Sequence, residues 1–498
     1  MPVVSAPVGH FSATSIKEFT IATRHVVAIG GSDAGISAAL RIRELDPGTD
    51  VTVVVADAYP NFSICGIPYY VSGEVTHWTN LAHRTAGDLE ATGMRLRTDT
   101  RVTAINPAAH TVDVVDSAGA ASQLGYDALI VGTGAVSTRP PLPGLVGPDA
   151  LGPPDGVHLL HSMGDTFAVM ESLTTRSPQT AAIIGAGYIG LEMAEALTTR
   201  GIHVTQIEAL PEVLPTVDPE LGGLIHAELQ RHGVDVLTDT TVTSIERAEH
   251  GALTVTARHD DQALTRTVDL VLVVVGVRPD TELAAHAGAQ LGSKGAIVVD
   301  EAMRTNLPDV FAAGDCVHTH HRLLGLTWLP LGTTAHKQGR VAGENALGGD
   351  ARFAGSLGTQ VVKVFDLVAA RTGLREHEVL AANRGWTPAT SQSSPDDHKA
   401  YYPGATPIHL RITGDQASGL LLGAQLVGHR SAEIAKRVDT YATALFHAMT
   451  VDAVSELDLS YTPPLGSPWD AVQLATQHWV REHCPATRAS GARQTAVL

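Results

Sequence analysis

The stretch Gly185-Ala186-Gly187-Tyr188-Ile189-Gly190 decides which fold this chain predicts. An apolar run at 181–184 comes before it and predicts a strand, and residues 191–199 after it predict a helix. A second strand is expected at 202–207, and Glu208 closes it. Glycines in this arrangement let a pyrophosphate approach the helix N-terminus, and an acidic residue about 20 positions on accepts a hydrogen bond from a ribose hydroxyl. The stretch therefore predicts a dinucleotide-binding unit.

The acidic residue of this unit also bears on which dinucleotide is bound. The carboxylate of Glu208 would accept a hydrogen bond from a ribose 2′-hydroxyl and would repel a 2′-phosphate. We therefore expect this unit to bind NADH in preference to NADPH. The residues assigned to this cofactor are Gly185, Gly187, Gly190 and Glu208.

A second, less complete unit stands near the start of the chain. A predicted strand at 25–29 runs into Gly30-Gly31-Ser32-Asp33-Ala34-Gly35, and a predicted helix at 36–45 follows. Ser32 replaces the usual second glycine, and the acidic residue expected after the next strand is displaced, with Asp57 the nearest candidate. Alone, this turn suits either a dinucleotide site or an ordinary strand-to-helix turn. The complete motif downstream favours a dinucleotide site, with Gly30, Ser32, Gly35 and Asp57 as its residues.

One of only three cysteines in the chain lies in Asn61-Phe62-Ser63-Ile64-Cys65-Gly66-Ile67-Pro68-Tyr69-Tyr70. Gly66 supplies a turn, and Pro68 suits the first position of a short helix. A thiol at a helix start faces the positive end of the helix dipole and unpaired N–H groups, which favour the thiolate. A lone cysteine is more often a buried, inert residue. The nucleotide motifs on either side make Cys65 the candidate redox residue.

Three more strand ends carry small or acidic residues suited to a cofactor. Gly132-Thr133-Gly134 follows one predicted strand, and Gly276 follows another at 271–275. A third strand delivers Asp315 at a glycine turn, where its carboxylate can accept from polyol hydroxyls or cap the segment that follows. We expect Gly132, Gly276 and Asp315 to bind cofactor.

Two further groups are assigned no chemistry. His318, His320 and His321 form a histidine-rich run, but no cysteine or carboxylate spacing supports a metal there, and we interpret them as surface polar residues. Cys316 directly follows Asp315 and is interpreted as a small packing residue. We expect no metal site.

Composition excludes several classes of function. The formal net charge of −18 argues against nucleic acid or an anionic membrane as a partner. No apolar run approaches the roughly 20 residues that span a bilayer, and the first residues lack a secretory signal pattern. Three widely spaced cysteines make no disulfide framework, so a reducing cytoplasm is the expected compartment.

The chain as a whole predicts an α/β protein with two Rossmann-like dinucleotide-binding domains and a C-terminal α+β domain. Strands are expected at 360–365, 407–412 and 420–426 around a polar stretch at 387–399, and a helix at 431–449. The expected division is an N-terminal extension at 1–24, a first domain at 25–150 and 278–348, a second at 151–277, a C-terminal domain at 349–484 and a flexible tail at 485–498.

These motifs run in order and resemble the FAD-dependent pyridine nucleotide–disulfide oxidoreductases. More narrowly, the chain is similar to their single-cysteine branch, which holds coenzyme A-disulfide reductase, coenzyme A-persulfide reductase and NADH oxidase. Besides the glycine turns and the Cys65 stretch, the motifs that carry the likeness are Tyr401-Tyr402-Pro403-Gly404 and Leu459-Ser460-Tyr461-Thr462-Pro463-Pro464. The resemblance implies FAD at the first glycine turn, with Asp315 near its ribityl chain, and NADH or NADPH at the second.

The resemblance also implies a reaction and an assembly. Cys65 would lie over the flavin, and because Tyr70 replaces a second cysteine, the site would work with one protein thiol. Family members with a disulfide substrate use tyrosines, which match Tyr461 and Tyr401-Tyr402, with Tyr402 preferred. In the family the C-terminal domain forms a homodimer and reaches the partner's active site. The implied acceptor is a small disulfide or persulfide.

Two other functions stay open on the sequence. In an NADH oxidase or peroxidase, Cys65 would cycle through a sulfenic acid and reduce oxygen or peroxide. In a redox sensor or an electron-supplying partner protein, every small acceptor would turn over slowly. The sequence also departs from relatives that bind coenzyme A, because Arg41, Arg43 and Arg84 make no obvious basic cluster for its phosphates. A different low-molecular-weight thiol is therefore an open alternative.

Overall fold

Residues 24–260 and 262–484 are described by the structure, a computed structural model, so most of the N-terminal extension and all of the tail lie outside the described residues. A parallel five-stranded sheet forms the first domain, in the order β18-β7-β1-β2-β3. Its strands are β1 (His25–Ile29), β2 (Asp50–Val54), β3 (Arg95–Arg97), β7 (Ala128–Val131) and β18 (Val310–Ala312). The core strands are continuous apolar runs, as a sheet covered on both faces requires.

Two long helices pack together beside this sheet. These are α1 (Asp33–Leu45) and α8 (Gly332–Ala346). They approach closely because Gly339 and Gly343 of α8 lie on the backbone of α1, where an added Cβ would come within 2.4 Å of a carbonyl oxygen. The first domain also holds the short helices α3 (Ala86–Ala91) and α7 (Glu282–His286).

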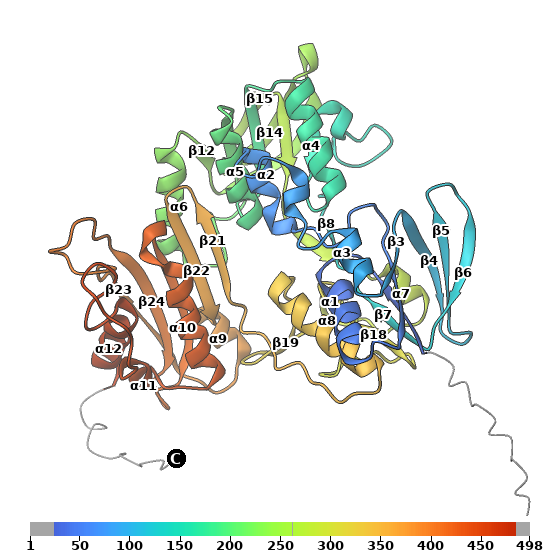
Figure 1. The fold of residues 1–498 in the computed structure, drawn as a ribbon. Helices are drawn as coiled ribbons and strands as arrows, with labels where there is room; N and C mark the ends of the chain where they lie inside the picture. The colour runs from blue at the N-terminus through green and yellow to red at the C-terminus, as the bar shows by residue number, and fades with distance from the viewer. Residues whose placement is uncertain (1–23, 261, 485–498) are drawn as a thin grey trace, which may run out of the picture.

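A second parallel sheet has the order β12-β11-β10-β16-β9. Its strands are β9 (Val157–Leu159), β10 (Thr180–Ile184), β11 (His203–Ile207), β12 (Asp235–Leu237) and β16 (Leu270–Val273). The helices of this domain are α4 (Met163–Thr175), α5 (Tyr188–Thr199) and α6 (Pro219–Arg231). It lies at the top of Figure 1, above the other two domains.

Each parallel sheet carries a three-stranded antiparallel sheet inserted in its chain path. The first consists of β4 (Thr100–Asn106), β5 (Thr111–Asp116) and β6 (Ala121–Gly125), and the second of β13 (Thr240–Arg247), β14 (Leu253–His259) and β15 (Gln262–Val268). The short strands β8 (Ala135–Ser137) and β17 (Val277–Pro279) pair where the chain crosses between the two domains. A further pair is β19 (Thr319–His321) and β20 (Gly325–Thr327).

The C-terminal domain is an antiparallel sheet in the order β21-β22-β25-β24-β23, with helices packed on it. Its strands are β21 (Gln360–Val364), β22 (Leu367–Gly373), β23 (Pro388–Ser393), β24 (Ile408–Asp415) and β25 (Leu421–His429). Its helices are α9 (Glu376–Ala382), α10 (Ile434–Phe446), α11 (Val451–Ser455) and α12 (Ala471–His483). The predicted α/β class, with two Rossmann-like sheets and a C-terminal α+β domain, is confirmed.

Strand β23 lies inside the stretch predicted to be polar and variable. Its Thr, Ser and Gln side chains lack the apolar alternation that predicts a strand. The strand is stabilised by tertiary packing rather than by the hydrophobicity of its own side chains. The indole N–H of Trp479 on α12 donates to the carbonyl of Ala389, 2.8 Å away, and holds the strand against the helix.

The histidine run is a second correction. His318 and His321 are buried, at 7% and 2% exposed, rather than surface residues. The ring Nδ1 of His321 accepts from the backbone N–H groups of Leu323 and Leu324, and burial lowers the pKa of His321 to about 4. This histidine is therefore a neutral residue at the end of β19 that holds the turn to β20.

The segment that holds Cys65 reaches the second domain. A single 3₁₀ turn, Ile64–Gly66, leads into α2 (Ile67–Ser72), in which Pro68 is the second residue, one position later than predicted. Helix α2 packs against α5, and Ile67 and Val71 join the hydrophobic core of the second domain. Cys65 is thereby held where the first and second domains meet. Among the described residues, no helix is both long and apolar enough to cross a bilayer.

Candidate functional site

The first glycine turn brings three of the predicted residues together by backbone contact. Gly30 has a φ of +109°, and a Cβ built on it would lie 2.1 Å from the carbonyl oxygen of Gly132. A Cβ on Gly35 would lie 2.1 Å from the carbonyl oxygen of Gly30. Only glycine fits at these positions, so the backbone of the turn stays open above the N-terminus of α1. Ser32 precedes α1, is exposed and makes no capping hydrogen bond.

Asp315 provides a test of whether this turn suits FAD. Its side chain is half-buried, and among the described residues none donates a hydrogen bond to its carboxylate. Burial and the neighbouring Asp33 raise the pKa of Asp315 to about 6. A half-buried acceptor without a protein donor fits a ligand with hydroxyl groups, and the N-terminus of α1 fits a pyrophosphate. The residues present therefore fit FAD.

The second glycine turn repeats this geometry and leaves more room. Gly185 has a φ of +101°, and a Cβ on Gly190 would lie 2.1 Å from the carbonyl oxygen of Gly185. A Cβ on Gly187 or on Gly276 would meet no atom within 4 Å. The first and third glycines of this motif are thus needed for packing, while Gly187 and Gly276 face open space where a ligand can approach the backbone.

Glu208 lies directly beside this turn. One carboxylate oxygen accepts from the backbone N–H of Ala186 at 2.7 Å, and the other accepts from that of Leu210 at 3.0 Å. A carboxylate offers about four acceptor positions, so each oxygen can accept one more hydrogen bond. The side chain is therefore oriented by the turn and retains capacity for ribose hydroxyls.

Asp57 does not take the equivalent place in the first domain. The registers Ile29↔Val54 and Ile184↔Ile207 make Val55 the counterpart of Glu208. A Cβ on Gly31 would clash with the side chain of Val55, 2.5 Å away, so this position is filled by apolar packing. Asp57 is exposed and accepts from the backbone N–H of Tyr59 at 2.9 Å.

Cys65 is the exposed middle residue of the 3₁₀ turn, and its surroundings are acidic. The surrounding protein displaces water and raises the pKa of the Cys65 thiol, and Glu192, Asp33 and Asp315 raise it further. The expectation that the helix start favours the thiolate is wrong, because burial and, after it, the three carboxylates outweigh the small effect of the helix end. The backbone N–H of Asn61 donates to the carbonyl of Gly31 at 2.7 Å, and α2 packs against α5, so the segment that holds Cys65 lies beside both glycine turns.

Glu192 is a neighbour of the thiol that the sequence did not single out. It lies on α5, directly after the second glycine turn, and accepts a hydrogen bond from the hydroxyl of Tyr69 at 3.4 Å. Burial, with a smaller contribution from Glu195, raises the pKa of Glu192 to about 7. A signal was present: two acidic residues three positions apart, Glu192 and Glu195, interrupt an otherwise apolar helix.

The candidate tyrosines lie together on the C-terminal domain and are not brought to Cys65 of the same chain. Tyr402 and Tyr461 are each 43% exposed. The hydroxyl of Tyr461 shares a hydrogen bond with Tyr401, whereas the ring of Tyr402 packs edge-on against His398 with centroids 5.7 Å apart. Within one chain, Tyr401 is thus the direct partner of Tyr461.

The basic residues considered for coenzyme A are mostly engaged. Arg41 of α1 forms ion pairs with Glu344 and Glu44, the former at 2.5 Å. Arg43 donates to the backbone carbonyls of Thr49 and Thr92. Arg84 is exposed. Arg41 and Arg43 are therefore committed to holding α1 in place.

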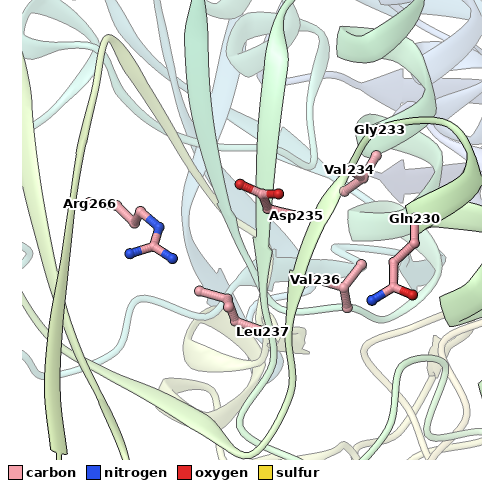
Figure 2. A pocket seen from close by; sticks show the side chains of 7 residues that line it. All are labelled: Gln230, Gly233, Val234, Asp235, Val236, Leu237 and Arg266. Atoms are coloured by element: carbon pink, nitrogen blue, oxygen red, sulfur yellow. The ribbon is translucent and has the colours of Figure 1, made fainter.

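A pocket of about 340 Å³ lies away from all of these residues. Figure 2 shows it at the edge of the second sheet, bordered by Asp235, Val236 and Leu237 of β12 and by Arg266 of β15. None of the predicted site residues lines it. The glycine turns and Cys65, not this pocket, define the candidate site.

Three comparisons with known proteins bear on this site. Residues 24–339 match the family described as pyridine nucleotide-disulphide oxidoreductase, and residues 359–471 match its dimerisation domain. An NADH oxidase of Methanocaldococcus jannaschii is 30% identical over 455 residues, covering 91% of this chain and 97% of that protein. An NAD(P)H sulfur oxidoreductase (CoA-dependent) of Pyrococcus furiosus is 34% identical over 449 residues, covering 90% and 97%. The structure of an NAD-dependent persulfide reductase from A. fulgidus gives a TM-score of 0.85 at 36% identity, covering 92% and 83%.

Proposed function

Because the chain belongs to the pyridine nucleotide-disulphide oxidoreductase family, we propose that it reduces a small disulfide or persulfide with NAD(P)H, through the single thiol of Cys65. The family makes it an FAD-dependent oxidoreductase. The observation that carries the proposal is the position of Cys65, which is exposed on a segment held by both dinucleotide-binding domains: Asn61 donates its backbone N–H to Gly31 of the first, and α2 packs against α5 of the second.

Each domain holds its own cofactor in this proposal. Gly30, Gly35 and Gly132 shape the site for FAD, and Asp315 accepts from its hydroxyl groups. FAD, when bound, supplies the means to pass the two electrons of a hydride from the nicotinamide to sulfur. Gly187 and Glu208 hold the nicotinamide dinucleotide, and the charge of Glu208 favours NADH.

The remaining chemistry belongs to the thiol. The Cys65 thiolate attacks one sulfur of the acceptor, forms a mixed disulfide and releases a thiolate. With Tyr70 in place of a second cysteine, no neighbouring thiol resolves this bond, so the pair of electrons from NAD(P)H must cleave it. The relative from Pyrococcus furiosus and the persulfide reductase from A. fulgidus support sulfur as the acceptor atom.

We place the completion of the site in a homodimer. The match of residues 359–471 to a dimerisation domain supports this assembly. Tyr401, Tyr402 and Tyr461 lie exposed on that domain and away from Cys65 of their own chain. In the dimer they would face the partner's Cys65, where Tyr461 or Tyr402 could protonate the leaving thiolate.

A second function is favoured by one relative. The NADH oxidase of Methanocaldococcus jannaschii supports oxygen or peroxide as the acceptor, with Cys65 cycling through a sulfenic acid. Both functions use the same thiol, so they differ only in the acceptor.

The Cys65→Ser variant tests the proposal. We expect it to keep NADH-dependent bleaching of the flavin absorbance and to lose turnover of coenzyme A disulfide, a neutral disulfide and persulfide by more than about 100-fold. Full turnover with any of these acceptors in that variant would refute the function. If the wild-type enzyme turns over oxygen or peroxide but none of these disulfide or persulfide acceptors, the second function is the correct one.

A further inference from the structure

We propose that Lys363 of the C-terminal domain is a positioning residue for Cys65 of the same chain, because it contacts both the helix that carries the thiol and the helix on which that helix packs. The inference rests on the proposed function of Cys65 and names the contact that fixes where its sulfur lies. It gives the C-terminal domain a role in the site of its own chain, separate from that of its tyrosines in a dimer.

The helix that carries the thiol cannot hold its own position. Cys65 and Tyr69 stand one helical turn apart on the continuous run formed by the 3₁₀ turn and α2. Helix α2 has six residues, and a helix this short is not stable without tertiary contacts. The place of the Cys65 sulfur therefore depends on what α2 packs against.

Apolar packing holds one face of α2. Ile67 and Val71 share one hydrophobic core with residues of α5 and with Val362 and Val364 of β21. At the far end of α2, the guanidinium of Arg200 donates to the carbonyl of Val71. Hydrophobic contact has no preferred direction, so the core alone does not fix how far α2 slides or turns on α5.

Lys363 supplies a directional contact at the middle of this packing. Its ammonium group lies over the Tyr69 ring, 5.6 Å from the centroid, and forms an ion pair with Glu195 of α5. The side chains of Lys363 and Glu195 are only 25% and 15% exposed. A cation is attracted to the face of an aromatic ring, and more strongly where water is excluded. One ammonium group thus joins α2 to α5.

Lys363 is itself held firmly along α5. Strand β21 is the edge strand of the C-terminal sheet, and it contacts α5. The second oxygen of Glu195 accepts from the backbone N–H of Phe365 at 2.8 Å. At the start of α5, the hydroxyl of Tyr188 donates to Oε1 of Gln360 at 2.5 Å. These contacts on either side of Lys363 fix its place, so Lys363 can hold α2 still.

The arrangement predicts a defect in the place of the sulfur rather than in its reactivity. The step that cleaves the mixed disulfide needs the Cys65 sulfur at a fixed place beside the cofactor. A displacement of about 1 Å can slow such an aligned step by about 100-fold. Alkylation of an exposed thiol by a small free reagent needs no such alignment. The two reactions therefore separate a displaced Cys65 from an altered one.

The test uses the FAD-loaded enzyme and 2-hydroxyethyl disulfide, once wild-type turnover has been shown to need Cys65. Rapid mixing measures reoxidation of the NADH-reduced flavin by the disulfide, and peptide mass measures alkylation of Cys65 by iodoacetamide in the oxidised enzyme. The variant Lys363→Met/Glu195→Gln removes both charges and keeps an oxygen for the Phe365 N–H. We expect its maximal rate of reoxidation to fall by about tenfold or more, while the half-saturating disulfide concentration and the alkylation rate stay within about twofold.

Conservative variants test which part of the contact matters. Lys363→Arg keeps a cation for both partners and should restore the rate to within about twofold of the wild type. Tyr69→Phe keeps the ring face and should do the same, whereas Tyr69→Leu should slow reoxidation as much as the double variant does. Adding Lys363→Met/Glu195→Gln to Tyr69→Leu should cost nothing further, because the two changes remove one interaction.

The matched control breaks a similar ion pair elsewhere in the same domain junction. Arg411 of β24 pairs at 2.7 Å with Asp218, which precedes α6 and not α2. Arg411→Met should lower the stability measured by urea unfolding and leave reoxidation within about twofold of the wild type.

The inference is wrong if Lys363→Met/Glu195→Gln reoxidises at the wild-type rate, or if its alkylation slows as much as its reoxidation. Equal losses in Tyr69→Phe and Tyr69→Leu would assign the effect to the Tyr69 hydroxyl instead. An equal loss in Arg411→Met would reduce it to a general loosening of the junction. If the double variant loses FAD, the comparison of Tyr69→Phe with Tyr69→Leu decides. Retained disulfide turnover in Cys65→Ser is a separate outcome, which removes the proposed function itself.

Discussion

The two glycine turns, at 30–35 and 185–190, share a backbone and differ in their side chains. In both, the first glycine has a positive φ and the last packs on its carbonyl oxygen. After the second strand of each unit, however, the first domain has the apolar Val55 and the second has Glu208. One fold thus offers two different sites: the first has a half-buried acceptor, Asp315, in the loop after β18, and the second keeps an acid beside its own turn.

The same comparison extends one turn into each helix. The position that Glu192 occupies on α5 is taken on α1 by Ser37, counting from the last glycine of each motif. Ser37 binds His336 of α8 at 2.8 Å and so helps to join two helices of one domain. Glu192 faces the α2 helix of another domain instead. The difference teaches that, at this position, the second helix supplies a titratable group at the domain boundary and the first helix does not.

The largest expected effect comes from a substitution that disrupts the backbone conformation shared by the two glycine turns. Gly30→Ala places a Cβ 2.1 Å from the Gly132 carbonyl oxygen at a φ of +109°. We expect the Gly30→Ala protein to lose most of its bound FAD and its free energy of unfolding to fall by at least about 2 kcal/mol. Absorbance gives the FAD content per chain, and urea unfolding gives the stability.

The control for this change lies in the other turn. Gly187→Ala adds a Cβ that meets no atom within 4 Å, at a φ of −77°. It should leave FAD content and stability unchanged and act only on the nicotinamide dinucleotide. A Gly30→Ala protein with full FAD and wild-type stability would contradict the backbone argument.

The next effect is the pH dependence of the free energy of unfolding, compared between Glu192 of α5 and Ser37 of α1. The pKa of Glu192 is raised in the folded protein from its ordinary 4.5 to about 7, so the folded state binds more protons than the unfolded state between these values. Stability is therefore lost as the pH rises through this window, by up to about 3 kcal/mol.

Glu192→Gln removes that dependence. Its stability relative to the wild type should rise between about pH 5 and about pH 8, as measured by urea unfolding of the FAD-loaded enzyme. Ser37→Ala, at the matching position of α1, should show no such trend. If the Glu192→Gln and wild-type curves stay parallel, Glu192 does not titrate in this window.

A smaller effect sharpens the difference between Val55 and Glu208. Glu208→Gln keeps an oxygen for the Ala186 N–H and removes the charge that would repel a 2′-phosphate. We expect the ratio of kcat/KM for NADH over NADPH to fall by about tenfold, which corresponds to about 1.4 kcal/mol. Steady-state assays with both cofactors measure it. An unchanged ratio would mean that the charge of Glu208 does not select the cofactor.

The smallest effect tests the engaged basic residues of α1. Arg41→Met removes ion pairs to Glu344 and Glu44 near the surface, so stability should change by less than about 1 kcal/mol. The ratio of KM for coenzyme A disulfide over a neutral disulfide should stay within about twofold, because Arg41 is already paired. A selective rise in KM for coenzyme A disulfide would instead assign Arg41 to its phosphates.

Much of the fold was predictable because glycine turns constrain backbone and sequence together. β1 and β10 begin within one residue of their predicted positions, and both turns open as expected. The helices begin three residues earlier than predicted, at Asp33 and Tyr188, because the last residues of each glycine turn form the first helical turn. β23 was missed because its polar side chains show no apolar alternation, and α12 and α9 pack on it.

The site was predictable only where a motif marks it. Cys65, Asp315 and Glu208 stand at strand or helix ends whose spacing carries information. The direction in which the pKa of Cys65 shifts was not predictable, since it depends first on burial and then on carboxylates from three separate segments of the chain. The pairing of Tyr461 with Tyr401 depends in the same way on loop packing that no local pattern encodes.

The most direct measurement of the account is the mass of the Cys65 peptide. The oxidised, FAD-loaded enzyme is treated with 2-hydroxyethyl disulfide, quenched and digested, with and without an equimolar amount of NADH. The account predicts a mixed disulfide on Cys65 that disappears when NADH is present, while the peptide of the buried Cys316 stays unmodified. An enzyme that turns over this disulfide without any adduct on Cys65 would contradict it.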